Sequence, residues 1–203
     1  MAVVTSTTRL QAVNKILAAV NEAPVASLPA TRRDAVLAEA VLDEVTREVL
    51  SRGWHFNTET ITVTPNVSNE IPVQATWAKV DLNDPSYYRG DYDIVVRDAK
   101  LYNTVTNSST FTTSMKVEVV LFQDFEKIPE AARRYIMVRA ARIFQDTAAG
   151  APNIHQFQER DEMMALLDLR DQEATDADYT VFDSWAVQRV VNRLSPLSGI
   201  GPY

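Results

Sequence analysis

The chain has 203 residues, 46 % of them hydrophobic and 23 % charged, and these fractions are typical of a folded protein with one sizeable domain. It contains no cysteine, which excludes disulfides, cysteine-ligated zinc, iron–sulfur clusters and thiol catalysis. The net charge of −7 without a basic stripe argues against binding to nucleic acid phosphates, and no phosphate-binding glycine loop, GxSxG elbow or HExxH motif occurs.

The first ten residues, MAVVTSTTRL, lack a basic region followed by a long apolar core, so we expect no secretory leader. No apolar run approaches the ~18 residues that a bilayer requires, so we also expect no membrane-spanning helix.

Two one-sided helices are predicted in the first quarter of the chain. Between Arg9 and Glu22 apolar residues recur at intervals of three and four, and Asn21 tolerates the left-handed conformation of a helix end. After a linker at 23–30, a second helix is predicted from Asp34 to Arg52, with Gly53 as its stop. The apolar positions are Leu10, Val13, Ile16, Leu17 and Val20, then Leu37, Val41, Val45 and Val49.

The pattern then changes to short runs of β-branched residues, from about Thr58 to Asp124. We predict a mostly antiparallel β region, because Asn, Asp, Pro and Gly separate the runs. Its strands are expected at 60–66, 70–77, 92–98 and 116–122, with a hairpin turning at Asp98-Ala99-Lys100. The Ser/Thr-rich stretch 103–115 is expected to form an exposed, mobile tip.

Two more helices are predicted after the β region. One runs from Ile128 to Asp146 with Pro129 at its first position, and the next from Pro152 to about Asp176. The second is long, about 37 Å at ~1.5 Å per residue, so one of its sides must contact the other helices or a neighbour. The expected stripes are Ala132, Tyr135, Ile136, Arg139, Ala140 and Ile143 on the first and Ile154, Phe157, Met164 and Leu167 on the second.

The order helix, helix, sheet, helix, helix and tail predicts an α+β fold. Residues 1–57 and 128–178 are expected to form a helical bundle from the N- and C-terminal helix pairs. Residues 58–127 would then be an inserted, mostly antiparallel β subdomain, and residues 179–203 a C-terminal docking tail.

A structural joint is predicted at Gly53, Trp54 and Phe56, where the second helix meets the β region. Large aromatic residues at such a position fill the seam between helices and sheet, with His55 between them facing solvent. The alternatives are a site in which Trp54 and Phe56 stack on a ligand and a small-ligand-binding module around Trp54 and Trp77.

The spacing of the acidic residues and histidines gives little support for a catalytic site. His155 and Glu159 lie one helical turn apart, and such a pair is usually exposed to solvent. His155 could act as a general base only if a carboxylate and a substrate pocket both lay next to it. The pairs Asp161-Glu162 and Asp43-Glu44 could imitate the two carboxylates of a glycosidase, but adjacent helical positions diverge by about 100°.

Four arginines occur in the stretch RRYIMVRAAR, at 133–142. They either pair with acidic residues of the second and fourth helices or form a surface between subunits. The sequence leaves both interpretations open.

The last stretch, 184–203, has no acidic residue although the chain is acidic. It either folds back on its own domain or docks on another chain, and docking is favoured because such a segment can gain a large contact area on binding. The residues expected to dock are Trp185, Val187, Arg189, Val190, Val191, Arg193 and Leu194.

Four blocks of the sequence occur together in one order and spacing. They are AVNKILAAVNEAPVASL (12–28), SRGWHFNTE (51–59), IPEAARRYIMVRAARIFQ (128–145) and FQERDEMMALLDLRDQE (157–173). Together they resemble the tail tubular protein A family, the head-to-tail adaptors of short-tailed bacteriophages. The SRGWHFNT block is the most specific, and Asn21 stands where the family usually has glycine.

The resemblance implies a structural virion protein without enzymatic activity or cofactors. It implies a dodecameric ring between the portal protein and the tail nozzle protein (of tail tubular protein B type), with DNA passing through without sequence-specific binding. Its place would be the virion tail, after assembly in the host cytoplasm and without direct membrane insertion. The alternative is a tail-associated cell-wall or polysaccharide hydrolase that uses an Asp/Glu pair.

Overall fold

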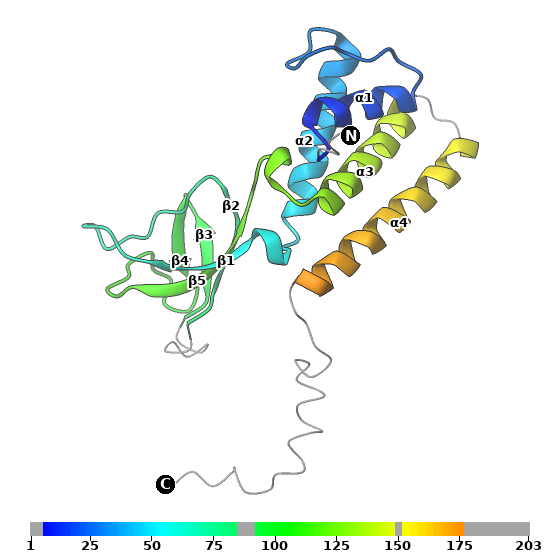
Figure 1. Ribbon diagram of the computed structural model, residues 1–203. Coiled ribbons are helices and arrows are strands. Elements are labelled where there is room, and N and C mark those ends of the chain that lie inside the picture. The colour runs from blue at the N-terminus through cyan, green and yellow to red at the C-terminus, as the bar shows by residue number, and fades with distance from the viewer. Residues whose placement is uncertain (1–5, 85–91, 149–151, 177–203) are drawn as a thin grey trace, which may run out of the picture.

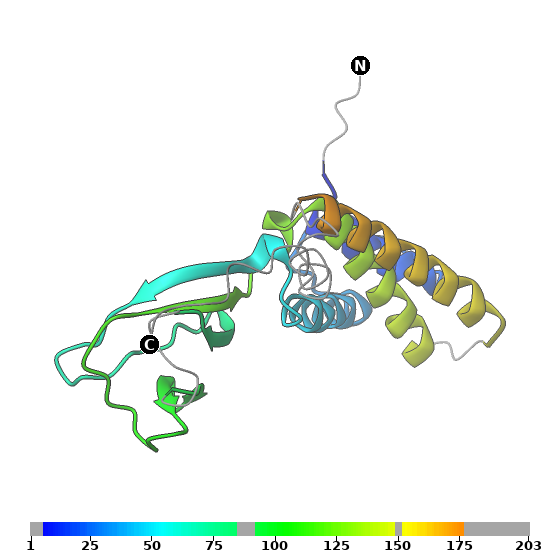
Figure 2. The same cartoon turned by 90° about the horizontal axis from the view of Figure 1, so that it is seen from below.

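The computed structural model describes residues 6–84, 92–148 and 152–176. A helical part and a β part lie end to end (Figures 1 and 2). The helices are α1 (Arg9–Ala19), α2 (Arg33–Leu50), α3 (Glu130–Ala148) and α4 (Pro152–Asp176), and the strands are β1 (Thr58–Val63), β2 (Trp77–Leu82), β3 (Ile94–Arg97), β4 (Lys100–Asn103) and β5 (Met115–Leu121). The predicted α+β class is confirmed.

The helix ends follow local capping chemistry. The Thr8 hydroxyl accepts a hydrogen bond from the Gln11 amide at 3.2 Å, and the Gln11 side chain accepts one from the Thr8 amide at 2.9 Å. Asn21 has the predicted left-handed conformation, with a φ of 57°, just after α1. The predicted bounds of α4 are confirmed, whereas α3 begins directly after Pro129 rather than including it.

The helical part is organised around α3, which packs against α1, α2 and α4, while α1 also packs against α2 (Figure 1). Its core contains the predicted faces of α1 and α3, including Ile16, Leu17, Tyr135 and Ile136. No helix in the described ranges is both long and apolar enough to cross a membrane.

The β part contains a three-stranded antiparallel sheet in the order β1-β5-β2 and a β3-β4 hairpin. The hairpin turns at Asp98 and Ala99, which both have positive φ, and Lys100 already belongs to β4. This part has a hydrophobic core of its own, formed by Val63, Ile71, Val80, Ile94, Leu101, Phe111, Met115, Val117 and Val119.

Two predictions for the β part are wrong. The stretch 70–77 is not a strand, since β2 begins only at Trp77, and Pro72, which has no amide hydrogen to donate, makes just one isolated bridge to Lys100. The stretch 103–115 is not simply an exposed tip. Phe111 is 3 % exposed in the β core, and its amide donates to the carbonyl of Asn69 at 2.7 Å.

The predicted apolar stripe of α4 is also wrong where the structure describes its side chains. Met164 and Leu167 are half exposed, and Ala165 and Leu169 face the core instead. The stretch 163–169 carries apolar residues on every side of the helix, so spacing alone could not select the buried face. The side chains of Ile154 and Phe157 lie outside the described residues.

Candidate functional site

We call residues 51–57 the joint, because they connect α2 to β1. Gly53 has a φ of +76°, a conformation that favours glycine. A Cβ atom at this position would lie 3.1 Å from Cγ2 of Val120 on β5. The end of α2 can therefore approach the sheet closely only because residue 53 has no side chain.

The two aromatic side chains of the joint lie against the helical core. Trp54 and Phe56 are partly buried there, and their rings stack with centroids 6.4 Å apart. The indole Nε1 of Trp54 donates to the carbonyl of Val49 at 2.8 Å, and the same carbonyl accepts from the amide of Arg52 at 3.3 Å, so the ring is fixed to the end of α2. His55, between them, is exposed, as predicted.

Asn57 makes the direct link between the two parts, and the sequence analysis missed it. Its side chain is completely buried, and its Nδ2 donates to the carbonyl of Leu50 at 2.9 Å and to that of Leu121 at 2.8 Å. Its Oδ1 accepts from the amide of Trp54 at 2.8 Å. One amide therefore joins the last residue of α2 to the last residue of β5. No signal in the local sequence marks Asn57, because most of the residues around it, from 55 to 60, are polar as well.

The C-terminal end of α4 also reaches the joint. Glu173 accepts a hydrogen bond from the backbone amide of His55. Beside this contact lies a depression of about 380 Å³, with Arg52, Thr58, Lys79 and Glu118 among the residues that line it. Its charges are mixed in sign, so it shows no preference for an anion or a cation.

An ion-pair cluster on α3 holds the helices together. Arg139 donates to Glu48 of α2 at 2.7 Å and to Glu162 of α4 at 2.6 Å, and Arg142 also donates to Glu162. Arg134 reaches Asp168 of α4 at 3.3 Å. Pairing of these arginines with the second and fourth helices is therefore confirmed.

The remaining arginine of this stretch, Arg133, is used differently. It is buried, and it donates to the backbone carbonyls of Ile128, Thr7 and Glu126. It thereby fixes the segment that leads from β5 into α3.

Two pKa shifts follow from the cluster. Burial alone would raise the pKa of Glu162, but hydrogen bonds from Arg142 and Arg139 outweigh it and hold this pKa below its ordinary value. Burial would lower the pKa of Arg139, but its bonds to Glu48 and Glu162 raise it overall. Both groups therefore stay charged at neutral pH, as structural ion pairs require.

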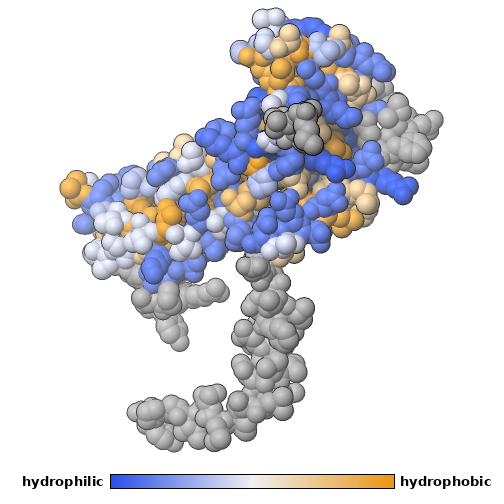
Figure 3. Space-filling view, viewed as in Figure 1, coloured by the Kyte–Doolittle hydropathy of each residue, from blue (hydrophilic) through white to orange (hydrophobic). Residues whose placement is uncertain are grey.

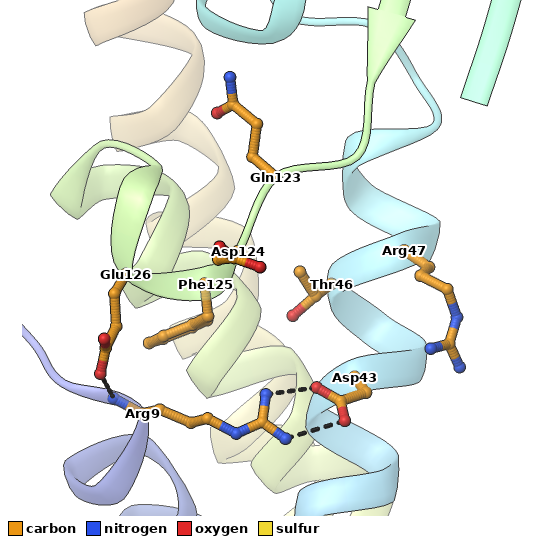
Figure 4. Close-up of a pocket in the computed structure, with 8 residues that line it drawn as sticks. All are labelled: Arg9, Asp43, Thr46, Arg47, Gln123, Asp124, Phe125 and Glu126. Atoms are coloured by element: carbon orange, nitrogen blue, oxygen red, sulfur yellow. Dashed lines mark hydrogen bonds and ion pairs between the residues drawn. The ribbon is translucent and has the colours of Figure 1, made fainter. Parts of the chain in front are cut away.

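A second depression, of about 390 Å³, lies where α1, α2 and the segment before α3 meet (Figure 4). Arg9 binds Asp43 there through both guanidinium nitrogens, with 2.8 Å between Nη2 and Oδ2, and this hydrogen bonding raises the pKa of Arg9. Glu126 accepts from the Arg9 backbone amide at 3.4 Å. The acids that line it are all engaged, because Asp43 pairs with Arg9, Asp124 with Lys127, and Glu126 with the Arg9 amide (Figure 4).

Comparison with known proteins identifies the family. The sequence model of the tail tubular protein family matches residues 10–179. The chain belongs to the tail tubular protein family. A curated relative, tail tubular protein A of Klebsiella phage KP34, is 28 % identical over 163 residues, which cover 80 % of this chain and 85 % of the relative.

Membership of the tail tubular protein family gives the molecule its general role. The family is a structural component of the phage tail, so this protein is a structural virion protein of the tail and not an enzyme. The resemblance found on the four sequence blocks is thereby confirmed at the level of the family.

The hydrolase alternative gains no support from the tail tubular proteins or from the acidic residues themselves. Asp43 is engaged by Arg9, and Glu162 by Arg139 and Arg142. The His155 side chain lies outside the described residues. Within the described ranges, no three His, Cys, Asp or Glu side chains form a group that could hold a metal ion.

The residues predicted to dock do not belong to the part of this tail tubular protein that the structure describes. Trp185, Val187, Arg189, Val190, Val191, Arg193 and Leu194 all lie in 177–203. The structure brings together Gly53, Trp54 and Phe56 of the predicted joint and adds Asn57.

Proposed function

We propose that this protein is a ring-forming head-to-tail adaptor that joins the portal to the tail nozzle protein and forms part of the channel through which DNA leaves. The observation that carries the proposal is the family match over 10–179, because it spans both the helical part and the β part. An adaptor needs two ends for two partners, and the two parts of this chain lie end to end (Figure 2). The ring would be dodecameric and would assemble in the host cytoplasm.

The charge of the chain suits a DNA channel. Twelve copies of a chain with net charge −7 would carry roughly −84, and negative charge on the channel wall would keep DNA from adhering during passage. DNA would then pass through without sequence-specific binding.

The joint has a mechanical role in this proposal. The proposed division is a helical unit of residues 1–57 and 128–178 and a β unit of residues 58–127, in which Gly53, Trp54 and Phe56 would fix the direction of the β unit. In a ring, that direction sets where the β units meet the nozzle protein. Asn57 supports the same geometry, because it binds the end of α2 and the end of β5.

The C-terminal segment would bind the portal. A chain lacking 184–203 is expected to fold normally but to lose binding to purified portal particles, measured by co-sedimentation. A chain lacking only 196–203 keeps the seven docking residues and is the matched control, with binding retained. Normal affinity of the chain lacking 184–203 would show that this segment is not the portal contact.

The position in the virion can be tested directly. Crosslinking of purified virions followed by mass spectrometry is expected to give links from the helical part to the portal protein and from the β part to the nozzle protein. Links to neither protein, from particles that contain the chain, would overturn the adaptor proposal.

A further inference from the structure

One face of α4 carries large apolar side chains that nothing in the described structure covers. Met163 is 65 % exposed, Met164 52 % and Leu167 49 %. These residues lie on the side opposite Ala165 and Leu169, which face the core. We call Met163, Met164 and Leu167 the α4 patch. Methionine and leucine side chains of this size are typical of helix faces that bind a partner.

A second exposed apolar pair lies at the beginning of α2. Val36 and Leu37 are each 47 % exposed, next to the buried Ala35 and Ala38. Figure 3 shows hydrophobic residues gathered at this upper end of the helical part. We call Val36 and Leu37 the α2 patch.

The two patches lie on different sides of the molecule. Both α2 and α4 pack against α3 with their buried faces, so their exposed faces point away from it (Figures 1 and 2). The patches are also unlike each other in sequence and size. If one patch of each subunit binds the other patch of the next subunit, the contact is heterologous. Repeated heterologous contacts form a closed ring when the rotation from one subunit to the next adds up to a full turn.

Charges beside the patches are complementary. Arg33 lies one helical turn before Val36 and Leu37, is exposed, and has no ion pair within the described ranges. Asp171 lies one turn after Leu167, and it too is exposed without an ion pair to a described residue. Each rim carries both signs, because Arg170 follows Leu167 by three residues and Asp34 precedes Leu37 by three. Asp171 and Arg33 can therefore pair across the contact, and so can Arg170 and Asp34, which would favour it and set its orientation.

We infer that the α4 patch of one copy binds the α2 patch of a second copy, with Asp171 beside Arg33 of that copy, and that repetition of this contact builds the ring. The inference rests on the proposed ring and adds the surfaces that form it. Each copy uses both patches, one toward each neighbour.

Complementation of two variants tests this contact. Met164→Glu damages the α4 patch and leaves the α2 patch intact, and Leu37→Glu does the reverse. Native mass spectrometry, with the chain alone and with portal protein present, is expected to show loss of assembly on the order of ten-fold or more for each variant. Their mixture restores one contact only, so it is expected to give a heterodimer of twice the 22.7 kDa chain and no ring.

Controls separate this contact from other effects. Val67→Glu introduces the same charge at a fully exposed apolar residue of the β part, and assembly is expected to be unchanged. Circular dichroism establishes that each variant is folded. If Met164→Glu prevents assembly and Leu37→Glu does not, the α4 patch binds something other than the α2 patch, and the inference is wrong.

Crosslinking gives a second measurement that does not depend on lost assembly. The chain has no cysteine, so paired substitutions report single contacts. Leu37→Cys together with Leu167→Cys is expected to form an oxidative ladder of multimers, and Leu167→Cys alone is not. Crosslinking of Leu167→Cys to Val190→Cys within one chain would mean that the C-terminal segment covers α4, which would overturn the inference.

The outcomes for the wild-type chain separate the two proposals. A wild-type chain that stays at 22.7 kDa alone and on the portal overturns both the ring and its contact. A wild-type chain that assembles while both variants assemble equally well overturns the contact and leaves the adaptor proposal standing.

Discussion

The helical part and the β part are held together in different ways. Among the described residues, twenty buried apolar residues form the helical core, eighteen from the four helices and two, Phe125 and Ile128, from the segment before α3. Ion pairs of α3 link the helices around this core. Nine buried residues form the separate β core. Val120 is buried but belongs to neither core, because it lies against Gly53 at the joint. Because its core is the larger, we expect the helical part to be the more stable of the two and the β part to depend more on the joint.

The largest effect is expected from Asn57→Ala. It removes three hydrogen bonds of a fully buried side chain, to the carbonyls of Leu50 and Leu121 and from the amide of Trp54, and leaves the space of the side chain empty, at about 3–4 kcal/mol in total. Hydrogen exchange is expected to rise in β1 and β5 well before it rises in α1 and α3. His55→Ala changes an exposed residue of the same joint and is the control. If exchange in Asn57→Ala rises equally in both parts, the β part does not depend more on the joint than the helical part does.

Trp54→Ala is expected to cost about 3 kcal/mol, the lower end for a large aromatic residue, because the ring is only partly buried. Denaturant unfolding measures this loss, and the yield of folded chain is expected to fall with it. Trp54→Phe keeps an aromatic ring but loses the hydrogen bond to Val49, so about 1 kcal/mol is expected. A stable Trp54→Ala variant that still assembles would show that the joint does not need this ring.

Gly53→Ala is expected to cost about 1–2 kcal/mol from its positive φ, with a further cost from the contact with Val120. A double-mutant cycle with Val120→Ala separates these contributions, since the smaller residue removes the contact and leaves the φ unchanged. If the free-energy costs of the two substitutions simply add, residue 53 and Val120 do not contact each other as closely as the structure shows.

The smallest expected effect is on how the stability of the helical part changes with pH. Because the pKa of Glu162 is lower in the folded chain, its contribution to stability is present above the unfolded pKa of about 4.3 and is lost as the pH falls below it. Glu162→Gln is expected to cost about 1 kcal/mol at pH 7 and to flatten this acid dependence. Glu159→Gln, an exposed acid on the same helix, is the control, and an unchanged acid profile of Glu162→Gln would contradict the assignment.

The elements were predicted best where local chemistry decides. Asn21 and Gly53 mark helix ends through their own backbone preferences, and both adopt positive φ. The strand pattern of β5 follows from alternation alone. The exposed face of α4 could not be predicted in this way, because residues 163–169 carry apolar side chains on every side of the helix and only contacts with α3 show which side is buried.

The site was harder to predict than the fold. The three expected residues of the joint were found from a glycine stop and two aromatic residues, which are local signals. Asn57 owes its role to Leu121, which lies 64 positions further along the chain, and no local pattern reports such a partner. Phe111 was missed for the same reason, since its burial depends on strands that are distant in sequence.

The position of Asn57 has a consequence for load. The chain enters the β part at β1 and leaves it from β5, and these strands are paired side by side with Thr58 opposite Val120. In the described ranges, the chain therefore passes between the two parts only twice, before β1 and after β5, and we call these two adjacent segments the neck. A force on the far end of the β part reaches the helices through the neck. The Asn57 side chain is the group that binds both segments of the neck, so the hinge between the two parts is expected to bend more easily when that side chain is removed.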